Sequence, residues 1–538
     1  MPVPPPEEPL ALWSRTSRRW TIAHLVSLGI ALVLLVLAAR GQWFFYDEWD
    51  FLASRAEWNL LGPHNGHLSF FPQLLTTLTK GVVGLEEYWP YLGFTIAVHL
   101  LLAHLLWRVM LRTGSHPLVA LLVSTIFAVL APGAENTLWA FQVGFITPLV
   151  TGAAALLIAM RPELRRRDIL IITALLLVGV GFAGTAIPIT GALLVFLLVR
   201  HGWRVAVLIG GVFGAVYGVW YLAFNRGSQG TDGMRASSAY DVLVRMPEYI
   251  SHGFVDSLAK TIPFDQLAPA LVLLFAVWLV LDVRKGGAGR ISAVHALVLA
   301  ALAFSLLTAF TRVQLGVESA SAGRYVYVYV ALLVPAAGRC LSVLAGRGRV
   351  GLTAVSVVLA MTLAFNVGGL LQQATGQATL EQSVNRAISA AIDLDDGSDE
   401  LAGRRPSPIV APPLTMADIR EFVARGQYTP VEYSDSDELD VRLNLFLRAE
   451  PVSAPEGYEC APVDDEGFVA LDDDEPLVES SVDATVRVRA VDGDAQSQFA
   501  QVQLPQGWSE LSGVEGASLR LEVPSNGSLC AALPVDGQ

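Results

Sequence analysis

The chain has 538 residues, of which 53% are hydrophobic and only 16% are charged. Soluble globular domains carry about 25% charged residues, so this composition excludes an ordinary soluble protein and indicates a protein embedded in a lipid bilayer. The formal net charge is −13, which is the wrong sign for a nucleic-acid-binding surface, and we expect no nucleic acid partner.

The charge is divided unevenly along the chain. Residues 373–538 contain no Lys and far more acidic residues than Arg, whereas residues 1–372 are net basic. This asymmetry predicts a multi-spanning membrane domain at 21–372 and an acidic soluble domain at 373–538. The basic connections described below place the N-terminus, residues 1–20, in the cytoplasm and the acidic domain outside the cell. The preference for Arg over Lys throughout is typical of a GC-rich bacterial genome.

Eleven apolar runs approach the length of a membrane span. The first is preceded by Arg residues and is followed by no small-residue cleavage site, so we interpret it as a retained signal anchor. The fifth and sixth are short and share the Gly-rich join "GVGFAGTAIP", so a broken or re-entrant pair is an alternative. The runs lie at 21–39, 90–111, 117–133, 138–160, 168–182, 185–199, 204–224, 266–283, 291–311, 325–343 and 350–372.

Basic connections occur at every second junction between these runs, as in "RVMLRTGSH", "RPELRRRD" and "VRKGGAGR". Cytoplasmic loops collect Lys and Arg, so the pattern predicts a multi-pass protein of a bacterial cell membrane with its N-terminus in the cytoplasm. It also predicts long outer loops at 40–89 and 225–265, and an extracytoplasmic C-terminal region.

Alternating apolar and polar residues in "ATVRVRAV" and "ASLRLEVP" predict half-buried strands after Gln372. We therefore expect the C-terminal domain to be β-rich or α+β. Cys460 and Cys530 both belong to it, and they could form a disulfide if the domain is extracytoplasmic, whereas Cys340 lies in an apolar run and is expected to pack there.

The stretch "FFYDEWDFLASR" follows the first apolar run and sets Asp47, Glu48 and Asp50 among aromatic residues. Aromatic belts with nearby acids are common at membrane interfaces, which is the plain interpretation. The alternative is functional: a carboxylate at the outer mouth of a span can act as a general base on a sugar hydroxyl or hold a divalent cation beside a phosphate.

"YDEWD" resembles the acidic pair that polytopic glycosyltransferases of the GT-C superfamily carry in their first external loop. The "GRYVYVYV" stretch, which contains Arg324, looks like the Arg-Tyr at the start of a late helix in several GT-C-like bacterial membrane proteins. The resemblance implies a GT-C fold, a sugar donor linked to polyprenyl phosphate and a cell-envelope acceptor. It implies Asp47 as the base or metal-site residue with Glu48 as its partner, and a divalent metal such as Mg²⁺ or Mn²⁺, held by these two acids, is the candidate cofactor.

A lipid-linked phosphate requires cations on the outer side, and the planar fork of Arg suits it. Arg312 and Arg324 bracket one outer loop, although an Arg at a span end also snorkels to lipid headgroups. Further candidates for a sugar pocket share the outer loops. They are Asp50, His64, His67, Glu135, Asn136, Trp139, Gln142 and Asp232.

The sequence thus predicts a polytopic α-helical membrane protein with about eleven spans, acting as an extracytoplasmic hexosyl- or pentosyltransferase on a glycan, lipid or protein. A transporter or flippase of a lipid-linked substrate is an alternative, disfavoured because few ionisable residues lie at mid-depth in the apolar runs. A non-catalytic scaffold that presents the acidic tail is the third hypothesis.

Overall fold

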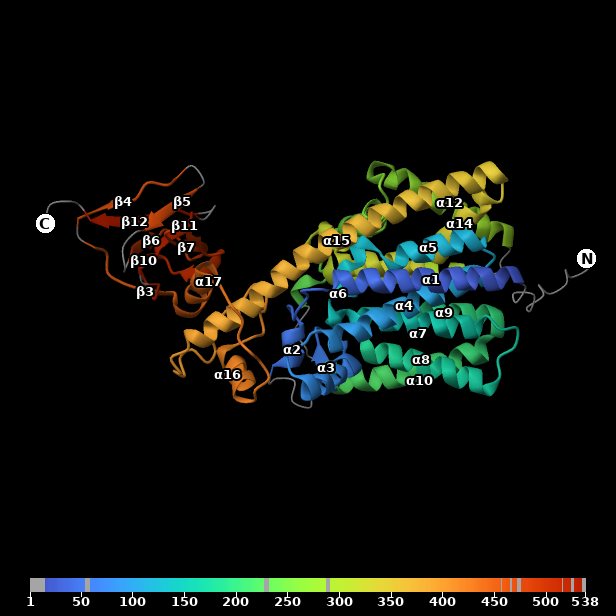
Figure 1. The fold of residues 1–538 in the computed structure, drawn as a ribbon, viewed down its shortest axis with the longest axis horizontal. Helices are drawn as coiled ribbons and strands as arrows, with labels where there is room; N and C mark the ends of the chain where they lie inside the picture. Colours follow the sequence, from blue (N-terminus) through green and yellow to red (C-terminus); the bar gives the residue numbers. More distant parts are fainter. Residues whose placement is uncertain are drawn as a thin grey trace, which may run out of the picture. The chain divides into compact units, whose positions relative to one another are not determined.

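The computed structural model describes residues 15–53, 59–226, 232–286, 291–455, 457–464, 467–471, 476–514, 516–523 and 527–534. Two compact units form (Figure 1). Unit 1 comprises residues 1–42, 58–78 and 89–378, and unit 2 comprises residues 43–57, 79–88 and 379–538. The first outer loop is therefore divided between the units, with residues 43–57 and 79–88 in unit 2. The prediction, with its single boundary at residue 372, assigned the whole loop to the membrane domain.

Unit 1 is a bundle of helices. Its longer helices are α1 (Arg15–Ala38), α4 (Trp89–Arg112), α5 (Pro117–Ala128), α7 (Val143–Ala159), α8 (Arg166–Phe182), α9 (Ala186–His201), α10 (Trp203–Trp220), α11 (Met246–Ala259), α12 (Ala268–Gly286), α13 (Ala293–Arg312), α14 (Gly323–Ala345) and the first part of α15 (Arg349–Asp393). Each of the eleven predicted apolar runs coincides with helix in the structure, because an apolar segment in lipid must satisfy its backbone hydrogen bonds internally.

Fewer helices meet the length of a full span than the eleven predicted. In the described part of the chain eight helices are long and apolar enough, and a ninth arises if α5 and the following segment Ala131–Leu138, bent by 46°, count as one. α8 and α9 have only 17 and 16 residues, or about 25 Å at 1.5 Å per residue, less than a 30 Å hydrocarbon core. The prediction of a polytopic helical membrane protein is confirmed, with eight to nine spans by length and composition.

Short elements connect the helices of unit 1. They are β1 (Pro63–His64), β2 (His67–Leu68), α3 (Phe70–Val83), η3 (Ala131–Gly133), α6 (Ala134–Leu138), η4 (Ala140–Gln142), η5 (Tyr221–Asn225), η6 (Asp232–Met234), η7 (Asp241–Arg245), η8 (Asp265–Leu267), η9 (Val313–Leu315) and η10 (Val317–Ser321). α3 begins in unit 1 and its last residues belong to unit 2.

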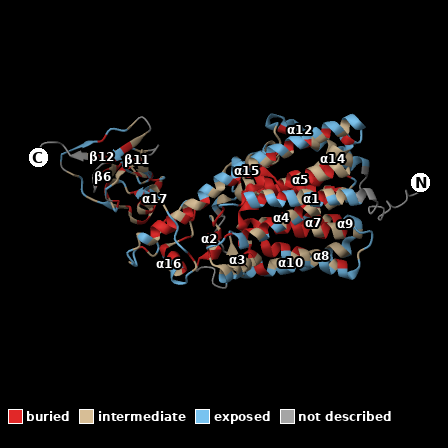
Figure 2. Cartoon of the chain, viewed as in Figure 1, coloured by how far each residue is buried: buried red, intermediate tan, exposed pale blue. Residues whose placement is uncertain are grey.

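Burial varies widely among the spanning helices (Figure 2). The apolar window that contains α7 is 78% buried, whereas that of α12 is 6% buried. Exposed apolar side chains along α12, such as Leu273 and Leu274, are expected where lipid takes the place of water. α7 therefore lies at the centre of the bundle and α12 at its periphery.

Unit 2 combines helices with a β-sandwich. Its elements are α2 (Glu48–Leu52), the end of α15, α16 (Met416–Ala424), α17 (Asp435–Phe446), β3 (Arg448–Pro451), β4 (Tyr458–Cys460), β5 (Phe468–Leu471), β6 (Leu477–Ser480), β7 (Ala484–Asp492), β8 (Ala495–Gln496), β9 (Ala500–Leu504), β10 (Gly507–Ser512), β11 (Ser518–Glu522) and β12 (Leu529–Pro534). The predicted strands "ATVRVRAV" and "ASLRLEVP" correspond to β7 and β11, which pair antiparallel.

Two antiparallel sheets enclose one apolar core. One has the order β3-β10-β6-β12-β4, and the other has the order β5-β11-β7-β8 with β9 also paired to β7. The core draws on both, with Val478 and Leu511 from the first sheet and Val488 and Leu521 from the second. Alternate residues of β7 are buried, as the period of a strand requires.

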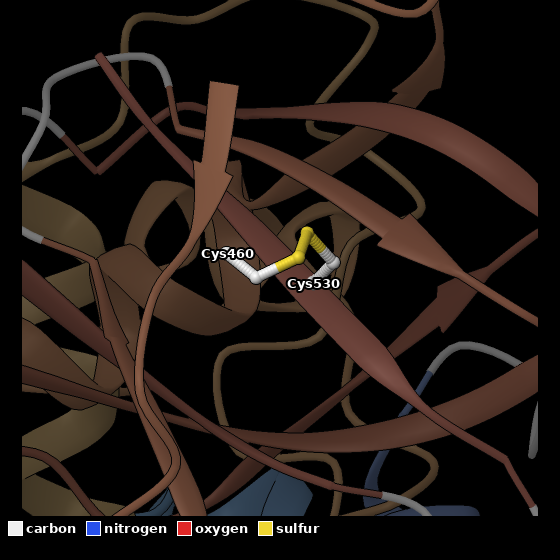
Figure 3. Close-up of a disulfide and its surroundings, with 2 residues drawn as sticks. All are labelled: Cys460 and Cys530. Atoms are coloured by element: carbon white, nitrogen blue, oxygen red, sulfur yellow. A yellow bond between two sulfur atoms is a disulfide. The ribbon is translucent and has the colours of Figure 1, made fainter. Parts of the chain in front are cut away.

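Cys460 of β4 and Cys530 of β12 form a disulfide, although they are 70 positions apart in sequence (Figure 3). β4 and β12 are paired neighbours in the first sheet, which brings the two cysteines together. Cys340 is unpaired and half-buried. The cross-link joins an edge strand to the strand beside it.

Candidate functional site

The acidic stretch lies in unit 2, where aromatic residues hold it in place. The Trp43 ring lies 5.5 Å from that of Trp49, and Trp49 in turn packs 6.3 Å from Phe422 of α16. The backbone amide of Tyr46 donates a hydrogen bond to the Val410 carbonyl at 3.0 Å. Residues of the first outer loop are therefore anchored to the C-terminal region, a contact that no local sequence pattern predicts.

Glu48 is 4% exposed, and its carboxylate accepts hydrogen bonds from neighbouring residues. Tyr88 donates its hydroxyl to both carboxylate oxygens, at 3.0 and 3.2 Å, and the backbone amide of Phe45 donates to Oε2 at 3.0 Å. A buried carboxylate with this many donors stabilises a turn rather than meeting a substrate. The geometry favours a positioning role for Glu48, in place of the direct partnership with Asp47 that the resemblance implies.

Asp47 and Asp50 are only partly buried, unlike Glu48. Asp47 precedes the first residue of α2, and Asp50 lies three residues later, so the two side chains share one face of the turn. A carboxylate oxygen of Asp47 lies within 4.8 Å of one of Asp50. Oxygens at this spacing suit a divalent cation, so the donors fit Mg²⁺ or Mn²⁺ better at Asp47 and Asp50 than at Asp47 and Glu48.

The remaining predicted site residues lie in unit 1. Arg324, the second residue of α14, is bound to Glu135 of α6: its backbone amide donates to Oε2 and its Nη1 to Oε1, both at 2.9 Å. Gly323 allows this approach, because a Cβ at that position would lie 2.8 Å from the Glu135 carboxylate. Glu135 holds the guanidinium through Nη1, and the Arg324 side chain is 40% exposed, so donors remain for another anion.

Arg312, the last residue of α13, lies close enough to the first outer loop for its charge to affect the pKa of His67. Burial, followed by the nearby charges of Arg312 and His64, lowers the pKa of His67 to about 4. His67 is therefore neutral near pH 7 and can accept or donate a hydrogen bond there, but it adds no positive charge. Its Nδ1 also lies 2.6 Å from the position of a Cβ on Gly184, so a side chain at residue 184 would displace it.

Three rings join the first and second outer loops within unit 1. Trp139 stacks on Phe141 with centroids 5.1 Å apart, and His64 meets Phe141 edge-on at 5.5 Å. Trp139 is only 3% exposed, so the partly exposed rings of Phe141 and His64 are the ones that offer an apolar face of the kind that sugar rings pack against. The sequence pointed to Trp139 and His64, and Phe141, which links them, was missed because an aromatic residue in an apolar run carries no signal of its own.

Asn136 and Gln142 are almost fully buried. Asn136 Nδ2 donates to Gln142 Oε1 at 3.4 Å, and the Thr95 hydroxyl donates to the neighbouring Ala140 carbonyl at 3.1 Å. This small polar network ties α4 to the bend after α5. Both residues lie beneath the loop surface, and their geometry supports the bend rather than direct sugar contact.

Asp232, the remaining pocket candidate, begins the short helix η6, and its side-chain surroundings lie outside the described part of the chain. Asp241 is the acid that organises this outer loop. Its carboxylate accepts hydrogen bonds from the backbone amides of Ser237 and Ser238 at 3.0 Å and from the Gln314 side chain at 2.9 Å. The bonds from the two serines, above all the one from the Ser237 amide, lower the pKa of Asp241 to about 2. The Ser238-x-x-Asp241 spacing is a capping-box signature that could have revealed it.

The convergence of four connections defines what we call the loop end of unit 1: residues 59–78, 131–142, 183–185 and 312–324. Contacts between His64 and Phe141, between His67 and Gly184, and between Arg324 and Glu135 join them. Lys260 adds a bond from Nζ to the Ser321 carbonyl at 2.6 Å, which the sequence did not single out. The loop end thus presents cations, the neutral imidazole of His67 and aromatic rings together.

Two crystal structures of ArnT from Cupriavidus metallidurans resemble the chain. The one bound to undecaprenyl phosphate has 14% sequence identity and a TM-score of 0.47, covering 79% of this chain and 88% of that chain. The apo structure has 13% identity and a TM-score of 0.46, covering 70% of this chain and 81% of that chain. No protein-family model matches the chain, and no match was found among curated proteins. Likeness at this level does not identify an activity.

Proposed function

We infer that the protein is a GT-C-type glycosyltransferase that moves a sugar from a polyprenyl-phosphate donor to a glycan, lipid or protein of the cell envelope. The observation that carries this proposal is the loop end of unit 1, which combines Arg312 and Arg324 with the neutral imidazole of His67 and with aromatic side chains. A phosphate needs fixed cations and a sugar needs hydrogen bonds with an apolar face, and these residue types supply both.

Arg324 is suited to hold the donor phosphate. Glu135 restrains its side chain through Nη1, so less conformational entropy is lost when the other guanidinium nitrogens bind an anion. Arg312 offers a second cation at the other end of the same loop. Polyprenyl phosphate leaves readily once its charge is neutralised, so the chemistry depends chiefly on electrostatics and positioning.

Asp47 is the proposed base, which would orient or deprotonate the acceptor hydroxyl. The resemblance of "YDEWD" to the acidic pair of GT-C enzymes supports this role. Asp47 with Asp50 would hold a divalent cation, which would supply positive charge when bound. Glu48 positions the turn through Tyr88 and the Phe45 amide.

The test is transfer of radiolabelled sugar from a panel of polyprenyl-phosphate donors to envelope fractions. Membranes with the wild-type protein should incorporate label, and membranes with an equal amount of Asp47→Asn should not. Glu87→Gln is a control from the same outer loop, outside the acidic stretch, and should retain transfer. Label incorporated by Asp47→Asn would remove Asp47 from catalysis. No label with any donor and the wild-type protein would contradict the proposed function.

A further inference from the structure

Unit 2 contains a cavity of about 510 Å³ that none of the proposed roles uses. It opens between the C-terminal part of α15, the start of α17 and the turn after β8. Every residue that lines it among the described residues has a polar side chain. A cavity of this size without aliphatic lining is unsuited to lipid or to an apolar peptide, and it suits a polar ligand.

The fold of α17 produces this cavity. Leu439 and Leu443, four residues apart, pack into the core of the β-sandwich. Asp437 and Asp440 are therefore turned away from the core, three residues apart on another face of the helix. The backbone amide of Gln498 donates to Asp440 Oδ1, which holds the turn after β8 against the helix.

The polar groups around the cavity are held in place by bonds of their own. Arg386 Nε donates to both oxygens of Asp437, at 3.0 and 2.9 Å, and the Ser434 hydroxyl donates to the same carboxylate at 2.7 Å. The Tyr433 hydroxyl donates to Asp393 Oδ2 at 2.7 Å. Groups fixed in this way lose little entropy when a ligand binds, which is the property of a preorganised site.

The side chains of Gln496 and Gln498 are exposed at the cavity, and each offers one acceptor and two donors. Burial raises the pKa of Asp440 to about 6, so this carboxylate is incompletely solvated and would gain from a hydroxyl donor. Amides and carboxylates beside a tyrosine ring match the alternating hydroxyls and C–H faces of a sugar.

We propose that this cavity binds a neutral or amino-bearing saccharide chain through Gln496, Gln498, Asp440 and Tyr433. Anionic glycans are disfavoured, because three carboxylates and one Arg line the cavity among the described residues. A divalent cation is disfavoured too, because Arg386 and Ser434 occupy the Asp437 oxygens and the remaining acids fall short of the six or more oxygens that Ca²⁺ takes.

The experiment measures binding of hexasaccharides of mannan, galactan and arabinan to the full-length protein in detergent by calorimetry, with chitosan and hyaluronan fragments for charge. No sugar donor is present, so the result is independent of the proposed transferase activity. The double variant Gln496→Ala/Gln498→Ala should weaken binding of the neutral or chitosan oligosaccharide at least about tenfold, because each lost hydrogen bond lowers affinity severalfold. It keeps the backbone bonds of both residues.

The matched control is Gln501→Ala/Gln503→Ala on β9, which removes two exposed glutamines that do not line the cavity. It should bind as the wild type does. The proposal is overturned if no neutral or chitosan oligosaccharide binds, or if both double variants bind equally. It is also overturned if hyaluronan binds as tightly as the neutral chains, or if spermidine or Ca²⁺ alone occupies the cavity and the oligosaccharides do not compete.

Discussion

Apolar side chains have opposite roles in the two units. In α12 of unit 1 they point outward: Val277 is 49% exposed, and only 6% of the apolar window of this helix is buried. In β7 of unit 2 they point inward, where Val486 and Val488 are buried and Arg487 between them is exposed. The comparison teaches that apolar residues leave water in both settings, by facing lipid on α12 and by packing against other side chains in the core of the β-sandwich.

The largest expected effect comes from placing the same charge in both settings. Val488→Asp would bury a carboxylate in the sandwich core and should destabilise unit 2 by at least about 4 kcal/mol, measured as lost protection in hydrogen exchange. Val277→Asp should leave unit 2 intact and disfavour insertion of α12 by about 2.5–3.5 kcal/mol in a translocon assay. Unimpaired insertion of Val277→Asp would show that α12 does not face lipid.

A second contrast concerns the cysteines. Cys460→Ser/Cys530→Ser removes the disulfide of unit 2 and should lower its free energy of unfolding by about 2–4 kcal/mol, because the unfolded chain is no longer constrained. Cys340→Ser in unit 1 removes no cross-link and is the control. Denaturant titration monitored in the β-sandwich measures both. Equal stability of the double variant and the control would contradict a structural role for the bridge.

Arg–carboxylate pairs in the two units should also differ in their effect on activity. Arg324→Lys keeps the charge but loses the planar fork, and it should reduce sugar transfer about tenfold in the labelled-donor assay. Arg420 in unit 2 makes a comparable pair with Asp395 at 2.6 Å, and Arg420→Lys should leave transfer unchanged. A loss of transfer in both variants would indicate a general effect on folding and would argue against donor binding by Arg324.

The smallest expected effect is the pH dependence of stability at Asp440. Burial raises its pKa to about 6 in the folded state, above the ordinary value near 4, so the folded state binds more protons between these values. Its contribution to stability is therefore lost as pH rises from about 4 to about 6, and it is constant above that range. Asp440→Asn should flatten this part of the curve, whereas an unchanged slope in thermal unfolding would contradict the raised pKa.

The elements with strong local patterns were predictable. Every apolar run is helical, and "ATVRVRAV" and "ASLRLEVP" form paired strands, because hydrophobic period and length are properties of neighbouring residues. The number of full spans was overestimated, because α8 and α9 are apolar but too short and α5 ends at a bend. The length of an apolar run in the sequence does not show where the helix itself begins and ends.

The sequence predicted which types of residue form the candidate site, but it predicted the role of each residue only in part. Arg324 and Glu135 were both chosen from sequence, but their ion pair spans 189 positions and depends on the missing side chain of Gly323. Asp47, Glu48 and Asp50 look alike in sequence, whereas the structure buries Glu48 against Tyr88 and leaves its two neighbours partly exposed. The local Ser238-x-x-Asp241 spacing could have revealed Asp241, but its bond to Gln314, 73 residues away, could not be predicted from sequence.

The sequence by itself determined the membrane class, the helical runs, the strand pattern and the acidic character of the C-terminal region, since all of these follow from composition and short-range period. Only the tertiary structure decided that residues 43–57 and 79–88 belong with that region, and which carboxylates are buried and which stay accessible. The physical reason is that the charge state and role of a polar group depend on its desolvation and its partners, and distant parts of the chain supply both.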